Sequence, residues 1–297
     1  MTGGFSWNLI ADVRSLWAYP FMVNAFRAGA IVAVVAGVMG WFMVLRRQAF
    51  AGHTLAVAAF PGAAGATLIG ISAAYGYFGF CAGAAVVIAL ATRRGGQGSR
   101  ASESALTGIV QAFTLACGLL FVALYRGFLN GTTALLFGSF LGITAGQVTV
   151  LAVLGLGVLA VMAVIGRPLL FASVDPDVAA AGRVPVRALS VAFLVLLGAA
   201  VAETAQITGA LLVFALLVMP AAAAQRLTPH PVAGLVLTVL IGWAVTWAGL
   251  IAAYYSPYPI GFYVTSFAFA IYLACHGAAA ARRAWQRPAP ATAGAAA

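Results

Sequence analysis

The chain has 297 residues, of which 64% are apolar and only 7% are charged. A membrane-crossing helix needs roughly 20 residues, so the apolar content allows about nine crossings and excludes a soluble domain with a polar surface. The formal charge of +10 comes from fifteen arginines, with no lysine, and five acids. A phosphate-binding loop of the G-x-x-x-x-G-K-[ST] type requires a lysine, so this chain has no such nucleotide site.

The first 20 residues are rich in aromatic side chains and are predicted to form a leader, residues 1–20, along the outer face of the membrane. Residues 21–280 are predicted to form a single transmembrane domain in an all-helical fold, because apolar runs of spanning length recur throughout. The nine runs cover residues 21–45, 50–69, 71–92, 105–125, 146–166, 188–205, 207–225, 231–253 and 262–280.

Two further segments depart from this pattern. Residues 126–145 are interrupted by Gly and Asn, so we expect a re-entrant or interfacial hairpin on the outer face. Residues 281–297 are rich in Ala and Pro and are predicted to form a disordered cytoplasmic tail.

Arginine positions predict the orientation, since loops kept on the cytoplasmic side carry an excess of basic residues. With the N-terminus outside, twelve of the fifteen arginines face the cytoplasm, whereas Arg14, Arg27 and Arg126 face outward. We therefore predict a multi-pass protein of the plasma or inner membrane, N-out and C-in, with the lipid bilayer as its surroundings. The arginines lie between apolar runs rather than on one basic face, so no nucleic-acid partner is expected.

Ionisable side chains at membrane depth are few and are therefore candidates for function. Glu203 is the one acid predicted at that depth, near an outer helix end, and Gln206 follows it. His53 lies early in the second run. Two interpretations stay open for each. Glu203 forms an outer gate for a cation or only reaches the headgroup region, and His53 faces a pathway or is an ordinary core residue.

No enzymatic motif accompanies these groups. The sequence lacks both the H-E-x-x-H pattern of membrane metalloproteases and the G-x-S-x-G pattern of serine hydrolases, and it has too few acids and histidines for a metal cage. We predict that the chain is not an enzyme and binds no cofactor. Transport or gating is then the expected role, and the many Gly and Ala residues allow close helix packing around a pathway.

A short capped helix is predicted at about 174–183. Asp175 is suited to its N-cap and Pro176 to its first turn, and Gly182 followed by Pro185 ends it. Such a helix between two spans on the arginine-rich side is suited to docking a cytoplasmic partner. An ordinary capped loop is the alternative.

Four segments together resemble the permease subunits of metal-type ATP-binding-cassette (ABC) importers, which take up zinc, manganese or iron. The segments are VLRRQAFAGHTLAVAAFPG at 44–62, TALLFGSFLGIT at 133–144, LLFASVDPDVAAAGRVPV at 169–186 and QITGALLVFALLVMPAAAA at 206–224. Their order and spacing carry the resemblance, which extends from about residue 21 to residue 280. It implies a type II ABC importer-like permease with about nine transmembrane helices.

The resemblance also implies partners. A second permease copy, as a homodimer or with a related chain, is expected with a pair of cytoplasmic ATP-binding subunits that hydrolyse the ATP and an extracytoplasmic metal-binding protein. The short helix is then the coupling helix, with its ATPase contact at Asp175, Pro176, Asp177, Ala179 and Gly182. The residues shared with the family motif after the first span are Arg46, Arg47, Gly52, Pro61 and Gly62.

The metal-binding part of that motif departs from the family. Family members have R-R-x-A-F-x-G-D-A-x-x-H-A, whereas here His53 occupies the Asp position and Val57 occupies the His position. An imidazole nitrogen suits zinc better than an oxygen-seeking ion. Zinc is therefore the first expectation for the transported substrate, followed by manganese and then by iron or a chelated metal. One ligand does not make a tight site, and pairing of His53 across a dimer axis is one remedy.

The sequence thus predicts a metal pathway that contains His53, Glu203 and Gln206, with His53 as the metal ligand. Two other functional classes stay open. One is a secondary transporter in which Glu203 carries a proton, although the inverted repeats typical of that class are not evident. The other is a membrane scaffold, which predicts no stable contact with an ATPase.

Overall fold

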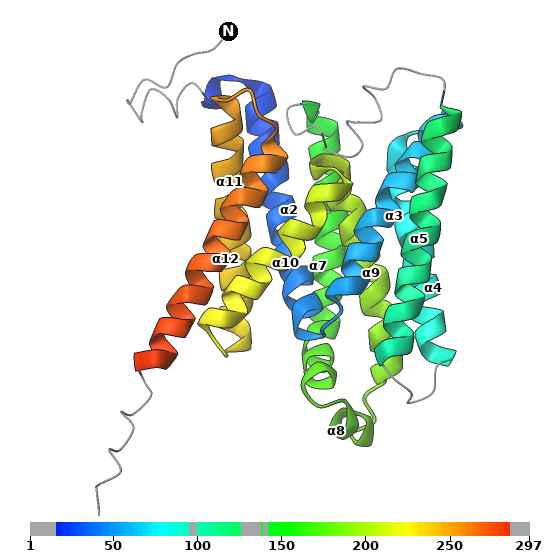
Figure 1. Ribbon diagram of the computed structural model, residues 1–297, viewed down its shortest axis with the longest axis vertical. Helices are drawn as coiled ribbons and strands as arrows, with labels where there is room; N and C mark the ends of the chain where they lie inside the picture. Colours follow the sequence, from blue (N-terminus) through cyan, green and yellow to red (C-terminus); the bar gives the residue numbers. More distant parts are fainter. Residues whose placement is uncertain (1–15, 95–99, 126–137, 139–141, 286–297) are drawn as a thin grey trace, which may run out of the picture.

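The computed structural model describes residues 16–94, 100–125, 138 and 142–285, and this part of the chain is built from helices without a strand (Figure 1). Long apolar runs fold as helices in a membrane because a helix satisfies its backbone hydrogen bonds internally. The helices are α2 (Pro20–Leu45), α3 (Ala49–Leu68), α4 (Ala73–Arg94), α5 (Arg100–Leu124), α7 (Ala145–Val174), α8 (Pro176–Ala181), α9 (Val186–Thr208), α10 (Ala210–Leu227), α11 (Pro231–Tyr254) and α12 (Ile260–Trp285).

Each of the nine predicted apolar runs corresponds to one of these helices, with ends that differ by a few residues. Seven of the described helices are long and apolar enough to cross a membrane, judged by length and composition: α2, α4, α5, α7, α9, α11 and α12. The remaining two runs form α3 and α10, which fall outside that set.

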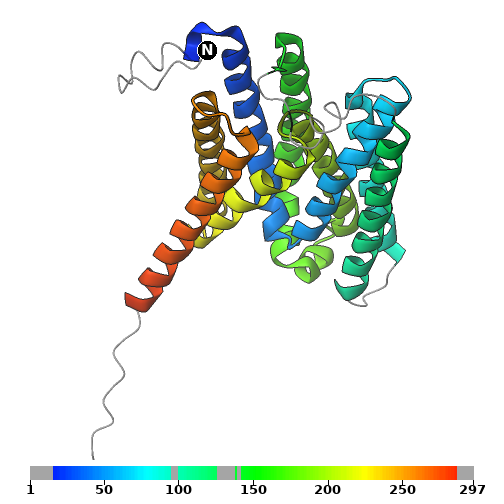
Figure 2. The ribbon, with the colours of Figure 1, turned by 45° about the horizontal axis from the view of Figure 1, so that its top comes forward.

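Helix α2 lies at the centre of the molecule and contacts α7, α9, α10 and α11. On one side α3 packs against α4 and α5, and on the other α10 packs against α11 and α12, as Figure 2 also shows. Glycines permit the closest approaches. At Gly40 of α2, for example, an added Cβ would lie only 2.1 Å from the Leu217 carbonyl oxygen of α10.

Two helix ends differ from the sequence prediction. The run predicted to end at residue 166 continues as α7 to Val174, because the helix accommodates Pro168 in its interior. Helix α12 extends to Trp285, so the start of the predicted disordered tail at 281–297 is helical. The rest of that tail, residues 1–15 of the leader and most of the predicted hairpin at 126–145 lie outside the described residues.

The short helix α8 projects at one end of the molecule, beyond the ends of α7 and α9 (Figure 1). The end of α2, the α4–α5 ends and the end of α10 lie toward the same end. Arginines in or next to these termini are Arg46, Arg47, Arg94, Arg100, Arg183, Arg187 and Arg226. These seven are among the twelve arginines that the orientation prediction places in the cytoplasm.

Candidate functional site

The turn between α2 and α3 is closed by backbone hydrogen bonds of the Schellman type. Gln48 N–H donates to the Met43 carbonyl at 2.9 Å, and Arg47 N–H donates to the Val44 carbonyl at 3.0 Å. Arg47 has φ 58°, the left-handed conformation that glycine usually supplies at this position. The turn thus fixes where α3 begins relative to the end of α2.

Arg46 uses its side chain to join three helices at that turn. Its guanidinium donates to Ser173 Oγ of α7 at 3.0 Å, to Ser190 Oγ of α9 at 2.7 Å and, through Nε, to Gln48 Oε1 at 3.1 Å. It also lies over the Phe193 ring, 5.3 Å from the centroid. The sequence placed Arg46 in a family motif but gave no signal for the serine partners.

His53 lies in the second turn of α3 and is partly buried. Its ring packs edge-on against Phe214 of α10, with 4.8 Å between the ring centroids. Its buried Nδ1 atom has no hydrogen-bond partner among the described residues. Val57, one turn later on the same helix, offers no second ligand.

The other motif residues of α3 serve packing. Pro61 is buried inside the helix. A Cβ at Gly52 would lie 2.2 Å from the Met43 sulfur, and a Cβ at Gly62 would lie 2.2 Å from the Gly76 carbonyl oxygen of α4. These two glycines bring α3 close to the end of α2 and to α4.

Glu203 of α9 is fully buried inside the chain. Neither carboxylate oxygen has a hydrogen-bond partner among the described residues. The space for the carboxylate comes from Gly155 of α7, where an added Cβ would lie 2.9 Å both from Glu203 Oε1 and from a methyl group of Val35. Glu203 is thus enclosed between α9, α7 and α2.

The polar residues near Glu203 do not form one network. Thr204 donates to the Ala200 carbonyl of its own helix at 2.7 Å, and Gln206 donates to the Ala202 carbonyl at 3.4 Å. His53 and Glu203 lie on helices that contact each other, yet no hydrogen bond joins them. Within the described residues, no three His, Cys, Asp or Glu side chains are grouped closely enough to hold a metal ion.

Helix α8 has six residues and a capped N-terminus. Asp175 accepts a hydrogen bond from Val178 N–H at 3.0 Å, and Pro176 occupies the first turn, as predicted. The helix ends at Ala181 with Gly182 as its C-cap, where the sequence predicted the end. Gly182 has an ordinary φ of −75°, and Arg183 with φ 60° takes the left-handed position instead.

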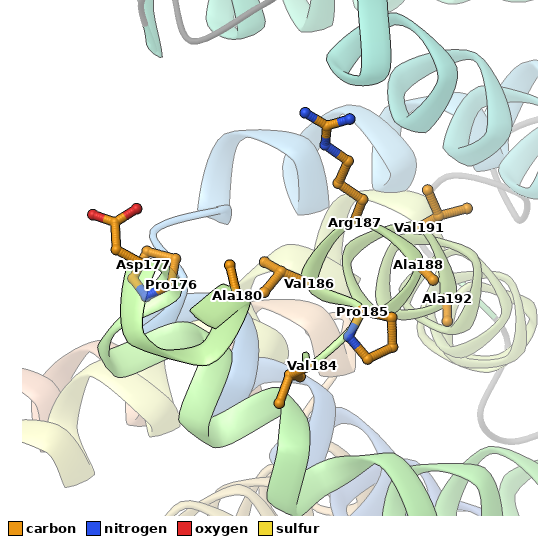
Figure 3. Close-up of a pocket in the computed structure, with 10 residues that line it drawn as sticks. All are labelled: Pro176, Asp177, Ala180, Val184, Pro185, Val186, Arg187, Ala188, Val191 and Ala192. Carbon is orange, nitrogen blue, oxygen red and sulfur yellow. The ribbon is translucent and has the colours of Figure 1, made fainter. Parts of the chain in front are cut away.

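A groove of about 1070 Å³ lies between α8 and the first turns of α9 (Figure 3). Its floor is apolar and includes Ala180, Val186 and Ala188, and the charged residues along it are Asp177 and Arg187. Pro176, Asp177 and Gly182 are exposed, whereas Ala179 is fully buried against the rest of the chain. Ala179 therefore packs α8 against the rest of the chain, and Pro176, Asp177 and Gly182 lie on its outer surface.

A comparison with protein families decides the relationship that these features suggest. The model of the ABC 3 transport family matches residues 18–277. The chain belongs to this family. As an ABC 3 family permease it is an all-helical, multi-pass protein of the plasma membrane.

Two relatives of this ABC 3 family permease are named as membrane proteins of metal transport systems. It is 30% identical to the manganese transport system membrane protein MntC of Halalkalibacterium halodurans over 243 residues, 82% of each chain. It is also 30% identical to the chelated iron transport system membrane protein YfeC of Yersinia pestis over 238 residues, 80% of this chain and 79% of that protein.

A solved structure has the same fold. The structure of PsaBC from Streptococcus pneumoniae in complex with a Fab superimposes with a TM-score of 0.79 at 24% identity, covering 90% of this chain and 95% of the matched chain. The predicted all-helical permease fold is therefore confirmed, whereas the count of nine transmembrane helices and the orientation stay predictions.

Proposed function

We propose that this ABC 3 family permease imports a divalent transition-metal ion, with ATP hydrolysed on separate cytoplasmic subunits. The observation that carries the proposal is its similarity, over about four-fifths of the chain, to a manganese and a chelated-iron transport protein. These names favour manganese or iron as the transported substrate. Zinc, which the imidazole of His53 favours, is the second candidate.

The pathway is proposed to contain His53, Glu203 and Gln206. An ionisable side chain buried without a partner among apolar helices is costly, and such side chains mark ion pathways in membrane proteins. Glu203 is fully buried and the His53 Nδ1 atom is unpaired. A carboxylate on α9 would supply the hard oxygen ligand that α3 lacks at position 53, and oxygen ligands suit manganese.

Helix α8 is proposed to be the coupling helix, on which the ATP-binding subunit docks. The exposed residues Pro176, Asp177 and Gly182 would contact the ATP-binding subunit, while buried Ala179 fixes the position of the helix. The groove beside α8, with Asp177 and Arg187 along it, would receive side chains of that subunit. A second permease copy and an extracytoplasmic metal-binding protein complete the proposed assembly in the bilayer.

Cellular metal content tests the proposed function. In cells that lack this gene, expression of the wild-type chain should restore manganese or iron content, measured by mass spectrometry. Glu203→Gln keeps the size of the side chain and removes its charge, so we expect uptake to fall by roughly tenfold at equal membrane expression, about the effect of 1.4 kcal/mol. Gly79→Ala, at a site with open space on α4, is the matched control and should keep uptake.

Two outcomes would count against parts of this proposal. If the Glu203→Gln variant keeps wild-type uptake, Glu203 is not part of the metal pathway. If the cells that regain the wild-type chain show no change in manganese, iron or zinc content, the proposal that the chain imports a metal is wrong.

A further inference from the structure

We propose that Arg46 is a positioning residue that couples the coupling-helix hairpin, α7–α8–α9, to the start of α3 and so to His53. This inference rests on the proposed function, because it requires that an ATP-binding subunit moves α8. It adds a route by which that movement reaches the pathway. Hydrogen bonds from the Arg46 side chain to Ser173, Ser190 and Gln48 carry the argument.

Arg46 joins the two ends of the hairpin that holds α8. Ser173 is the next-to-last residue of α7, and Ser190 lies in the first turns of α9. The Arg46 guanidinium donates to both serine hydroxyls, at 3.0 Å and 2.7 Å. A planar guanidinium can hold two acceptors at once in a fixed geometry, which a lysine ammonium does not reproduce. Any displacement of α8 that shifts these ends must therefore pull on Arg46.

Arg46 is connected to α3 through the hydrogen-bonded turn at Arg47 and Gln48. Its Nε donates to Gln48, the residue that precedes α3, at 3.1 Å. The backbone of Gln48 is itself held by Met43 of α2, and the Gln48 carbonyl accepts from Gly52 N–H at 3.1 Å. Gly52 adjoins His53 in the chain. The path from α8 to His53 thus consists of side-chain hydrogen bonds and one turn closed by backbone hydrogen bonds.

The Phe193 ring of α9 strengthens the same connection. Arg46 lies over this ring at 5.3 Å, and the ring of Phe42 in the last turn of α2 lies 6.5 Å from it. The guanidinium is partly buried, and a cation over an aromatic face is stabilised more strongly when water is reduced. The end of α2 and the first turns of α9 are therefore expected to move together.

The alkylation rate of a cysteine at position 53 tests this coupling, and it does not require that the transported substrate is known. In a background with Cys81, Cys117 and Cys275 replaced by alanine, the His53→Cys variant is purified with its ATP-binding subunits. The alkylation rate at position 53 is measured without ATP and after trapping with ATP and vanadate. With Arg46 and both serines present, we expect the two rates to differ by roughly fivefold or more, the size of a typical coupling between sites.

Removal of the serine hydroxyls is the decisive change. Ser173→Ala with Ser190→Ala should bring the two alkylation rates together while the ATP-binding subunits still co-purify. Ser173→Thr with Ser190→Thr retains the hydroxyls and should restore the difference. Thr238→Val is the matched control, because the Thr238 hydroxyl donates to the Gly234 carbonyl within α11. A structural role alone would not separate the alanine pair from the threonine pair in this readout.

The outcomes decide the proposal. A full rate difference in the alanine pair, or no difference in the protein with both serines, would overturn it. If the alanine pair fails to assemble, Ser190→Ala alone and Arg46→Lys are measured by the same criterion. Absence of manganese, iron and zinc uptake with the wild-type chain would refute metal import but leave this measurement valid, so the two failures are distinguishable.

Discussion

Gly62 and Gly76 bring the backbones of α3 and α4 into direct contact. A Cβ on Gly76 would lie 2.0 Å from the Gly62 carbonyl oxygen, and a Cβ on Gly62 would lie 2.2 Å from the Gly76 carbonyl oxygen. No side-chain movement can relieve a contact with a backbone oxygen. Because α3 carries His53, this contact helps to fix the depth and angle of the candidate pathway helix.

Gly76→Ala is therefore expected to separate α3 from α4 and destabilise the protein. Overpacking of this kind costs ~1–3 kcal/mol. The melting temperature in detergent should fall by several degrees. Gly79→Ala, three residues along the same helix, meets open space and should match the wild type or exceed it slightly, since alanine favours the helix. Equal melting temperatures for the two variants would contradict this account of the α3–α4 contact.

At the scale of single residues, the sequence identifies candidate ionisable side chains but not their surroundings. His53 and Glu203 stand out because ionisable residues are rare in apolar runs. The enclosure of Glu203 opposite Gly155 depends on packing between helices far apart in the chain, and no local pattern reports that. The left-handed Arg47 and Arg183 were missed because glycine is the residue that normally signals such a position.

Among the elements, α8 was predicted well because its signals are local. An Asp cap, a Pro in the first turn and a Gly-x-x-Pro end lie within a few residues of one another. The ends of α7 and α12 were predicted less well. Pro168 disfavours a continuing helix, and Arg282 and Arg283 end the apolar run, yet the helix continues in both places. A propensity is a weak guide where packing supports the longer helix.

The cap of α8 gives a prediction at this scale. Asp175→Ala removes the acceptor for Val178 N–H and should cost about 1 kcal/mol of helix stability, weakening binding of the ATP-binding subunit by about fivefold. Asp175→Asn keeps a side-chain oxygen at the cap and should bind nearly as the wild type does. Affinity is measured with the permease in nanodiscs. If Asp175→Asn binds as weakly as Asp175→Ala, the carboxylate charge matters rather than the cap.

For the whole molecule, hydropathy and arginine spacing predicted an all-helical membrane protein, and the ABC 3 family match confirms that class. The helix ends then place α8 and most of the described arginines at one end of the molecule. This arrangement fits an N-out, C-in chain, which stays a prediction, as do the second permease copy and the motor. The exposed surface of α8 is the feature of this chain on which the proposed contact with the ATP-binding subunit depends.

Metal transport by the purified assembly tests the central claim most directly. The permease and its co-purifying ATP-binding subunits are reconstituted in proteoliposomes, and entry of radioactive manganese is followed with ATP, without ATP and with an imposed proton gradient. We predict manganese movement only when ATP is hydrolysed. Movement that follows the proton gradient without ATP would identify a secondary transporter instead, and would contradict the proposed function.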